Sequence, residues 1–247
     1  MKVILQGYGL MGKKVAKLLR EDEKVEIVAI VSYQFDEEVQ EKTYKSMDEV
    51  SEDCDVVIDF SHPNNLDSLL TYSLKHHNNL VIATTGFNDE QLNKIKEASS
   101  KLAIFQSFNT SFGIQMMTKI LKQVSKELYD AGFDIEIEER HHHKKIDAPS
   151  GTAKLLADVI HDEIPETYDV LDRSAIHEKR KHEEVGIQSL RGGTIFGEHE
   201  IMFAGEDEII SIKHTALSKD VFARGAFEAA KALRDKENGL YDLKNIY

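Results

Sequence analysis

Cysteine is almost absent from this 247-residue sequence, and so are long apolar runs. Because Cys54 is the single cysteine, no intramolecular disulfide can form, which favours a reducing compartment, and we expect the chain to be cytoplasmic. No apolar run approaches the roughly 18 residues that a membrane-spanning helix needs. The N-terminus, MKVILQGYG, lacks the apolar core and cleavage site of a signal peptide and has the pattern of a strand. The sequence therefore predicts a protein without a membrane partner.

Positive charge is also scarce. The chain has 31 Lys and Arg against 44 Asp and Glu, a formal net charge of −13, and a field of this sign repels polyanions. We therefore expect no nucleic-acid partner. The composition is otherwise that of an ordinary globular protein, with 41% hydrophobic and 30% charged residues. At about 100 to 200 residues per domain, the length suggests one large domain or two modest ones.

The first half of the chain alternates short β-branched runs with amphipathic segments, a rhythm typical of βαβ units and a parallel sheet. The predicted strands are Lys2–Gln6, Val25–Ser32, Val56–Phe60, Leu80–Thr84 and Leu102–Gln106. The predicted helices are Gly12–Arg20, Pro63–Lys75, Asp89–Ser99 and a longer one over about Ser111–Ala131.

Beyond Gly132 the pattern changes to strands with a single clear helix, Thr152–Ile164. The predicted strands are Asp134–Arg140, Ile187–Leu190, Thr194–Ala204 and Glu208–His214. The polar segment Leu171–Gly186 is expected to be a surface loop or a disordered lid. We expect the last helix, Lys219–Asp235, and the tail after it to pack back on the first sheet.

These patterns predict an α/β fold with two domains. A Rossmann-type dinucleotide-binding domain would comprise residues 1–110 and 219–247. A second, smaller α+β domain built on a mixed sheet would comprise residues 111–218.

A glycine-rich turn follows the first predicted strand and precedes the first predicted helix. Its sequence, GYGLMG from Gly7 to Gly12, is GxGxxG. In this pattern Gly7 permits a tight turn, Gly9 lets backbone approach a pyrophosphate, and Gly12 lets helix and strand pack closely. The amides of the helix N-terminus would then face the phosphates. A glycine-rich turn without a ligand is the alternative, and the position in a βαβ unit favours dinucleotide binding.

The end of the second predicted strand bears on the choice of cofactor. An Asp or Glu there would hydrogen-bond the ribose of NAD, but this sequence has Ser32. A hydroxyl does not repel a 2′-phosphate, and Lys13 or Lys14 could pair with one, whereas the acidic residues Asp36 to Glu38 argue against it. We expect NADPH to be accepted, alone or together with NADH.

The densest chemistry lies in ERHHHKKIDAPSGTA, residues 139–153, between a predicted strand and a predicted helix. Three adjacent histidines suggest a metal, yet neighbouring residues rarely point at one ion, and no further ligand pair has a useful spacing, so we expect none. Imidazoles beside lysines suit an anionic substrate and proton transfer near neutral pH, with His141 and Lys145 as the candidate acids. The amides of Gly151 and Thr152 at the helix start would suit a carboxylate. A solvated basic loop is the plainer alternative.

The same segment resembles the signature of the dihydrodipicolinate reductase family. The resemblance continues through VIDFSHP, ATTGF, SFNTSFG, RGGTIFGEHEIMF and GLYDLKNIY. It implies an enzyme of the diaminopimelate route to lysine that transfers a hydride from NADPH or NADH to a cyclic dicarboxylate. It also implies a homotetramer assembled through the sheet of the second domain.

The resemblance also implies roles for particular residues. His141 would donate or accept a proton, Lys145 would donate one, His142 would bind substrate, and Gly151 and Thr152 would hold a substrate carboxylate. The implied cofactor contacts are Gly7, Tyr8, Gly9, Leu10, Met11, Gly12, Ala83, Thr84, Thr85, Ser107, Phe108, Asn109 and Thr110.

Two other classes of function remain open from the sequence. Another NAD(P)-dependent amino-acid or semialdehyde dehydrogenase would share the glycine turn but leave HHHKKIDAPSGT unexplained. A non-enzymatic dinucleotide sensor would bind the cofactor without turnover.

Overall fold

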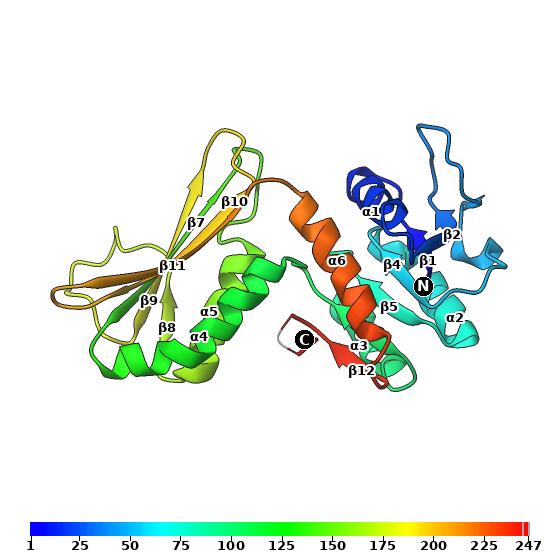
Figure 1. Cartoon of the computed structure of the whole chain (residues 1–247). Helices are drawn as coiled ribbons and strands as arrows, with labels where there is room; N and C mark the ends of the chain where they lie inside the picture. Colours follow the sequence, from blue (N-terminus) through cyan, green and yellow to red (C-terminus); the bar gives the residue numbers. More distant parts are fainter. Residues whose placement is uncertain (244, 247) are drawn as a thin grey trace. The chain divides into compact units, whose positions relative to one another are not determined.

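The computed structural model describes residues 1–243 and 245–246 (Figure 1). The chain forms two compact units. The first contains Met1–Phe112 together with Asp220–Tyr247, and the second contains Gly113–Lys219. No helix within the described residues is long and apolar enough to cross a membrane.

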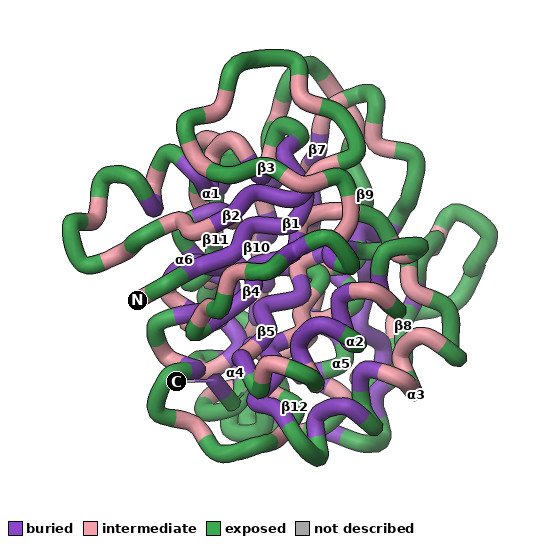
Figure 2. The backbone as a smooth tube through the Cα atoms, turned by 90° about the vertical axis from the view of Figure 1, so that its right-hand side faces the viewer, coloured by how far each residue is buried: buried purple, intermediate pink, exposed green. Residues whose placement is uncertain are grey.

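The first unit is built on a seven-stranded sheet in which every pairing is parallel, in the order β12-β6-β5-β4-β1-β2-β3. The strands are β1 (Lys2–Gln6), β2 (Glu26–Val31), β3 (Thr43–Tyr44), β4 (Val56–Asp59), β5 (Asn79–Ile82), β6 (Ala103–Gln106) and β12 (Gly239–Tyr241). The central strands are buried along most of their length (Figure 2), which explains their nearly continuous Val, Ile and Leu content. Strand order reverses between β1 and β4, and ligands of open α/β sheets bind at such a point.

Helices cover both faces of this sheet. They are α1 (Leu10–Arg20), α2 (Leu66–His76), α3 (Asp89–Ala98) and α6 (Asp220–Leu233), with short 3₁₀ turns at Met47–Glu49 and Pro63–Asn65. On one face α2 and α3 pack together over Ile4, Leu80 and Ile104, whereas α6 contacts α1 and the strands β4 to β6. The last helix and the tail thus return to the first sheet as predicted; of the tail, Lys244 and Tyr247 lie outside the described residues.

The second unit is a five-stranded mixed sheet, β11-β10-β7-β9-β8, with α4 and α5 beside it (Figure 1). Its strands are β7 (Asp134–His141), β8 (Tyr168–Val170), β9 (Glu184–Arg191), β10 (Gly197–Ala204) and β11 (Ile209–Ala216), and its helices are α4 (Phe112–Asp130) and α5 (Gly151–Glu163). Strand β10 is antiparallel to β7 and β11, whereas β9 is parallel to β7 and β8. The predicted fold class is confirmed.

Alternation along β7 places two polar residues in the interior. Every second residue of this strand is buried: Ile135, Ile137, Glu139 and His141. A carboxylate and an imidazole therefore share the core-facing side with two isoleucines.

The segment Leu171–Gly186 is more ordered than expected at its end, since β9 begins at Glu184 rather than Ile187. Arg180 explains this difference. Its guanidinium donates to the backbone oxygens of Ile135 on β7 and Glu184 on β9, and it pairs with the carboxylate of Asp134. These bonds join the end of the segment to the sheet, while residues 171–183 form no strand or helix.

Candidate functional site

The glycine turn after β1 has the geometry that its sequence predicts. Gly7 has φ of +93°, and a Cβ there would lie 2.4 Å from the carbonyl oxygen of Phe60. A Cβ on Gly12 would lie 1.9 Å from the carbonyl oxygen of Gly7, so α1 can pack this closely only with glycine. Gly9 differs, because the space beside it is open and no side chain caps the first amides of α1. The turn therefore leaves room and hydrogen-bond donors for a phosphate at Gly9.

Two pockets lie along the carboxyl edge of the first sheet, and Phe60 and Ser61 line both. The pocket on the glycine-turn side has a volume of about 340 Å³, and its lining includes Gly7, Tyr8, Gly9, Ser32, Tyr33, Lys45 and Ser46. The other has a volume of about 300 Å³, and its lining includes Met11, Ala83, Thr84, Thr85, Ser107, Phe108, Thr110 and Phe222. Together they form two chambers on either side of the end of β4, a shape that suits the two halves of a dinucleotide.

Three of the implied cofactor residues line neither pocket. Leu10 is exposed on α1, and Gly12 is buried where α1 meets the turn. The side chain of Asn109 is buried, and its Oδ1 accepts the backbone N–H of Ser111 at 2.8 Å. Gly12 and Asn109 therefore shape the backbone around the pockets rather than their surface.

A buried carboxylate supports the segment between the two pockets. Asp59, the last residue of β4, is 2% exposed, and its Oδ1 accepts the hydroxyl of Ser61 at 2.6 Å and the backbone N–H of Ser61 at 3.1 Å. Burial raises the pKa of Asp59 to about 6, with the Ser61 hydroxyl acting in the opposite direction. These hydrogen bonds fix the turn at Phe60 and Ser61.

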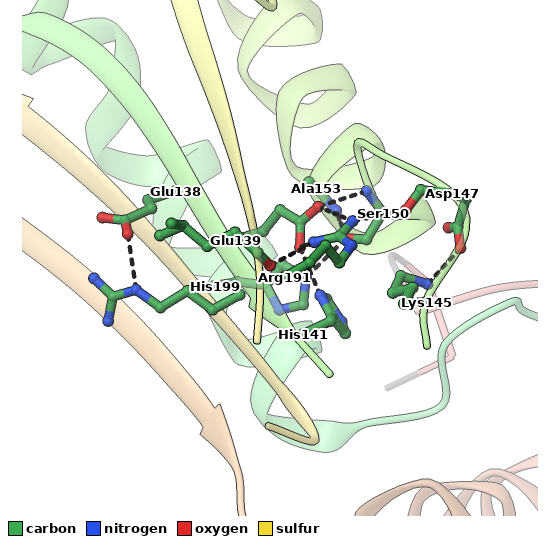
Figure 3. A network of polar contacts seen from close by, with 11 residues as sticks. Glu138, Glu139, His141, Lys145, Asp147, Ser150, Ala153, Arg191 and His199 are labelled. Atoms are coloured by element: carbon green, nitrogen blue, oxygen red, sulfur yellow. Dashed lines mark hydrogen bonds and ion pairs between the residues drawn. The ribbon is translucent and has the colours of Figure 1, made fainter. Parts of the chain in front are cut away.

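In the second unit, Glu139 receives donors from several directions (Figure 3). Its carboxylate contacts Nδ1 of His141 at 2.5 Å and accepts two hydrogen bonds from the guanidinium of Arg191, at 2.7 and 2.8 Å. It also accepts the backbone N–H of Ser150 at 3.1 Å. Burial opposes the charged form, but the hydrogen bonds from His141 and Arg191 prevail and hold the pKa of Glu139 well below its usual range.

The start of α5 belongs to the same cluster. The hydroxyl of Ser150 accepts the backbone N–H of Ala153 and lies 3.0 Å from Nε2 of His199. His199 is buried on β10, and burial together with the charge of His141 lowers its pKa to about 3, so its imidazole is neutral. Gly151 and Thr152 follow directly at the helix N-terminus, and a Cβ on Gly151 would meet open space. A carboxylate could approach the helix here.

The loop after β7 carries the remaining candidates. The ammonium of Lys145 lies 2.8 Å from a carboxylate oxygen of Asp147, and its backbone N–H donates to the carbonyl oxygen of His142. Burial and the nearby cation of Lys219 lower the pKa of His142, and its buried Nδ1 has no partner among the described residues. A further guanidinium bond of Arg191 holds the loop through the carbonyl oxygen of Asp147 at 2.6 Å. His141, His142, Lys145, Gly151 and Thr152 all lie between the end of β7 and the first turn of α5.

Sequence reasoning missed several residues of these clusters. Arg191 and His199 lie about 50 residues beyond His141 in the chain and reach it only through strand pairing. Phe222 comes from α6, and Lys45 follows the two-residue strand β3. The segment RGGTIFGEHEIMF contributes to the family resemblance as a whole, but no local pattern within it indicates individual functional residues. Among the described residues no group of His, Cys, Asp or Glu side chains could hold a metal ion.

A Rossmann sheet with a glycine turn, in one chain with a mixed sheet that carries a histidine–carboxylate pair, defines the class of two-domain NAD(P)-dependent oxidoreductases. Comparisons with known proteins narrow this class. Residues 1–110 match the family model "Dihydrodipicolinate reductase, N-terminus", and residues 113–247 match "Dihydrodipicolinate reductase, C-terminus". The chain belongs to the dihydrodipicolinate reductase family. It is an NAD(P)H-dependent oxidoreductase of the route to diaminopimelate and lysine.

Two relatives illustrate how far the likeness extends. The 4-hydroxy-tetrahydrodipicolinate reductase of Exiguobacterium sibiricum is 47% identical over 247 residues, which cover 100% of this chain and 96% of the relative. The enzyme of the same name from Staphylococcus aureus is 46% identical over 246 residues and covers 100% of both chains.

Solved structures agree in fold. A dipicolinate-bound dihydrodipicolinate reductase from Paenisporosarcina sp. TG-14 has a TM-score of 0.83 at 24% identity, over 100% of this chain and 99% of that one. A DAP dehydrogenase from C. glutamicum has a TM-score of 0.60 at 12% identity, over 99% of this chain and 93% of that one. The fold alone is thus shared with other dehydrogenases, and it is the sequence match that selects the reductase family over them.

Proposed function

We propose that this chain reduces 4-hydroxy-tetrahydrodipicolinate, a cyclic dicarboxylate, with NADPH or NADH. Residues 1–110 and 219–247 would bind the dinucleotide, and residues 111–218 would bind the substrate and form contacts between subunits. The observation that carries the proposal is the pairing of His141 with the buried carboxylate of Glu139, which also accepts the backbone N–H of Ser150 at the start of α5. A proton-transfer group and an anion-binding helix end are thereby held together.

The first unit supplies binding and orientation. Open space at Gly9 and the uncapped start of α1 suit the pyrophosphate. Thr84 lines the second pocket, and its buried hydroxyl lies beside Asp59, whose charged form it favours. When bound, a reduced nicotinamide supplies a hydride. The protein's part is to hold the ring in one orientation.

The second unit supplies the proton. Hydride addition to an electron-poor ring carbon leaves an electron pair that must take up one proton. Glu139 occupies Nδ1 of His141, which leaves Nε2 for proton exchange. Gly197 keeps room at that atom, since a Cβ there would lie 3.1 Å from Nε2. The ammonium of Lys145 is the second donor, and it would leave Asp147 to reach the substrate.

Substrate carboxylates would be held by the amides of Gly151 and Thr152 and by the imidazole of His142. Charge-assisted hydrogen bonds at a helix start are strong and directional, so they fix the ring relative to the proton donors. The reaction then depends on orientation as much as on acidity.

A coupled assay tests this function directly. The substrate is generated in place from pyruvate and aspartate semialdehyde, and the oxidation of NADPH or NADH is followed by absorbance. Turnover with at least one cofactor is expected. A wild-type enzyme that oxidises neither would refute the proposal and favour a dinucleotide sensor.

Two neighbouring lysines test the proton donor. Lys145→Ala should lower turnover about 100-fold or more at saturating cofactor, because general acids contribute about 10²- to 10⁴-fold. The dissociation constant of the dinucleotide should stay nearly constant. Lys144→Ala, at an exposed neighbouring position, is the control and should keep full turnover. Equal activities of the two variants would remove Lys145 from the chemistry.

We also propose a cytoplasmic homotetramer. The single, partly buried Cys54 suits a reducing compartment. Strand β11 stands at an edge of the second sheet and exposes Ile209, and Leu190 is exposed on β9. Light scattering of the purified protein measures the mass, and a monomer at micromolar concentration would contradict the assembly.

A further inference from the structure

Lys45 lies beside Ser32 at the carboxyl edge of the first sheet. Strands β2 and β3 are parallel, and their register pairs Val31 with Tyr44. The backbone N–H of Ser32 donates to the carbonyl oxygen of Tyr44 at 2.9 Å, which extends this register by one position. Ser32 and Lys45 are therefore neighbours, and both line the pocket on the glycine-turn side.

The two lysines that the sequence suggested for this pocket are already paired. The ammonium of Lys13 lies 2.5 Å from Asp36 and 3.6 Å from Glu37, and that of Lys14 pairs with Asp220. Within residues 1–243 and 245–246, the ammonium of Lys45 forms no ion pair. The backbone N–H of Lys45 donates to Glu49, which holds the main chain in place and leaves the side chain exposed.

The position of Ser32 determines what such a cation can bind. In Rossmann domains the end of the second strand meets the adenosine ribose, where a carboxylate selects NAD and a cation accommodates a 2′-phosphate. Here the residue at the strand end is a neutral serine, and the next strand places a lysine next to it. Tyr33, 87% exposed at the same pocket, offers an aromatic face to the adenine.

We propose that Lys45 binds the 2′-phosphate of NADPH and makes this chain prefer NADPH to NADH. The proposal rests on the proposed binding of a dinucleotide by the first unit. It assigns the preference to the residue that follows β3 rather than to Lys13 and Lys14 on α1. Ser32 contributes by its neutrality, because it neither repels the phosphate nor neutralises Lys45.

Lys45→Met tests the assignment in the full-length enzyme. Loss of a charge-assisted hydrogen bond should weaken NADPH binding about 10- to 100-fold. The Michaelis constant for NADPH should rise accordingly, while that for NADH changes less than about twofold. Calorimetric titration with 2′,5′-ADP and with 5′-AMP provides a readout without catalysis, and only the first ligand should lose affinity.

Two further variants sharpen the test. Lys13→Met removes a lysine that is already paired, so the ratio of the two affinities should stay that of the wild type. Ser32→Glu places a carboxylate beside Lys45 and should lower the affinity for 2′,5′-ADP by a similar factor. Retained 5′-AMP binding shows that each variant is folded.

The proposal would be overturned if the wild type bound 2′,5′-ADP no more tightly than 5′-AMP. It would also be overturned if Lys45→Met weakened both ligands equally, or if Lys13→Met, rather than Lys45→Met, removed the preference. Failure of the proposed function is a separate result, since the reductase assay can fail while both adenosine ligands still bind.

Discussion

At the level of single residues, the most informative feature is Glu139, a carboxylate that lies beside apolar side chains. Glu139 shares the interior side of β7 with Ile135 and Ile137, and only its donors make the charge tolerable there. One of these donors, Arg191, also holds the loop that carries Lys145 through the carbonyl oxygen of Asp147. Glu139 thus serves both the stability of the sheet and the position of the groups that we propose transfer protons.

Substitution of Glu139 should have a larger effect than substitution of its neighbour Glu138 on the same strand. Glu139→Gln should lower the free energy of unfolding by about 3 kcal/mol, because Arg191 loses its buried partner. Turnover of the folded enzyme should also fall while dinucleotide affinity remains, since His141 loses the group that orients it. Glu138→Gln, on the opposite face in a half-exposed pair with Arg140, should cost less than about 1 kcal/mol. Urea titration and initial rates measure both effects, and equal losses in the two variants would contradict this role.

Asp59 makes the free energy of unfolding depend on pH. Its pKa is raised from 3.8 to about 6 by burial, so the folded state binds more protons than the unfolded state between these values. Its contribution therefore weakens stability as pH rises from about 4 to about 6. Asp59→Asn should raise the free energy of unfolding at pH 7 by about 1 to 3 kcal/mol, with the gain vanishing near pH 4. Urea titrations at the two pH values check this, and a gain of equal size at both would show that charge is not the cause.

Residues gathered in one stretch of sequence were accessible to prediction, and residues gathered by the fold were not. His141 and Lys145 lie in one short segment rich in ionisable residues, and the GxGxxG pattern by itself predicts a tight turn. Arg191 reaches Glu139 only because β9 pairs with β7 in a register that places it opposite His141. Lys45 similarly depends on the pairing of β3 with β2, and no local periodicity marks a strand of two residues.

Among the structural elements, the turn between β1 and α1 shows two different uses of glycine. Gly12 is required by contact with the backbone of Gly7, whereas Gly9 faces open space. Gly12→Ala should therefore destabilise the protein by about 2 kcal/mol or more, since the backbone must shift to admit the methyl group. Gly9→Ala should change stability by less than about 1 kcal/mol and mainly weaken dinucleotide binding. Thermal melts and titration with NADPH distinguish the two, and a pattern with the roles exchanged would contradict the assignment.

The longer elements followed from their periodicity, and the short ones did not. Strand β1 has the predicted bounds, and α1, α3, α4 and α6 begin and end within two residues of theirs. Strands β3, β8 and β12 have two or three residues each, too few for a pattern. The first three residues of β9 were not predicted as strand because they belong to a polar segment. They are ordered by the hydrogen bonds of Arg180 to two strands.

At the scale of the whole molecule, the net charge of −13 is an average that does not show where positive charge is concentrated. It argues against large polyanions, but the segment from Arg140 to Lys145 combines cations and imidazoles at the end of one strand. Some surface cations are paired with carboxylates, as Lys13 and Lys14 show. The cations proposed to bind ligands act locally, and they suit small anions such as a dicarboxylate or a dinucleotide.

The first unit is assembled from both ends of the chain, which predicts how truncation will act. A chain that ends at Lys219 lacks α6, whose Ala226, Ala230 and Leu233 are buried, and it should lose dinucleotide binding and the cooperative unfolding of this unit. A chain that ends at Asn238 keeps α6 but lacks β12 and the buried Leu243 and Ile246 that follow this strand. It should still bind NADPH, with a melting temperature lower by about 10 °C, since two buried aliphatic side chains contribute about 3 to 5 kcal/mol. Calorimetry of both chains tests the order of these losses. Full NADPH affinity in the shorter chain would show that the first unit is complete without its C-terminal helix.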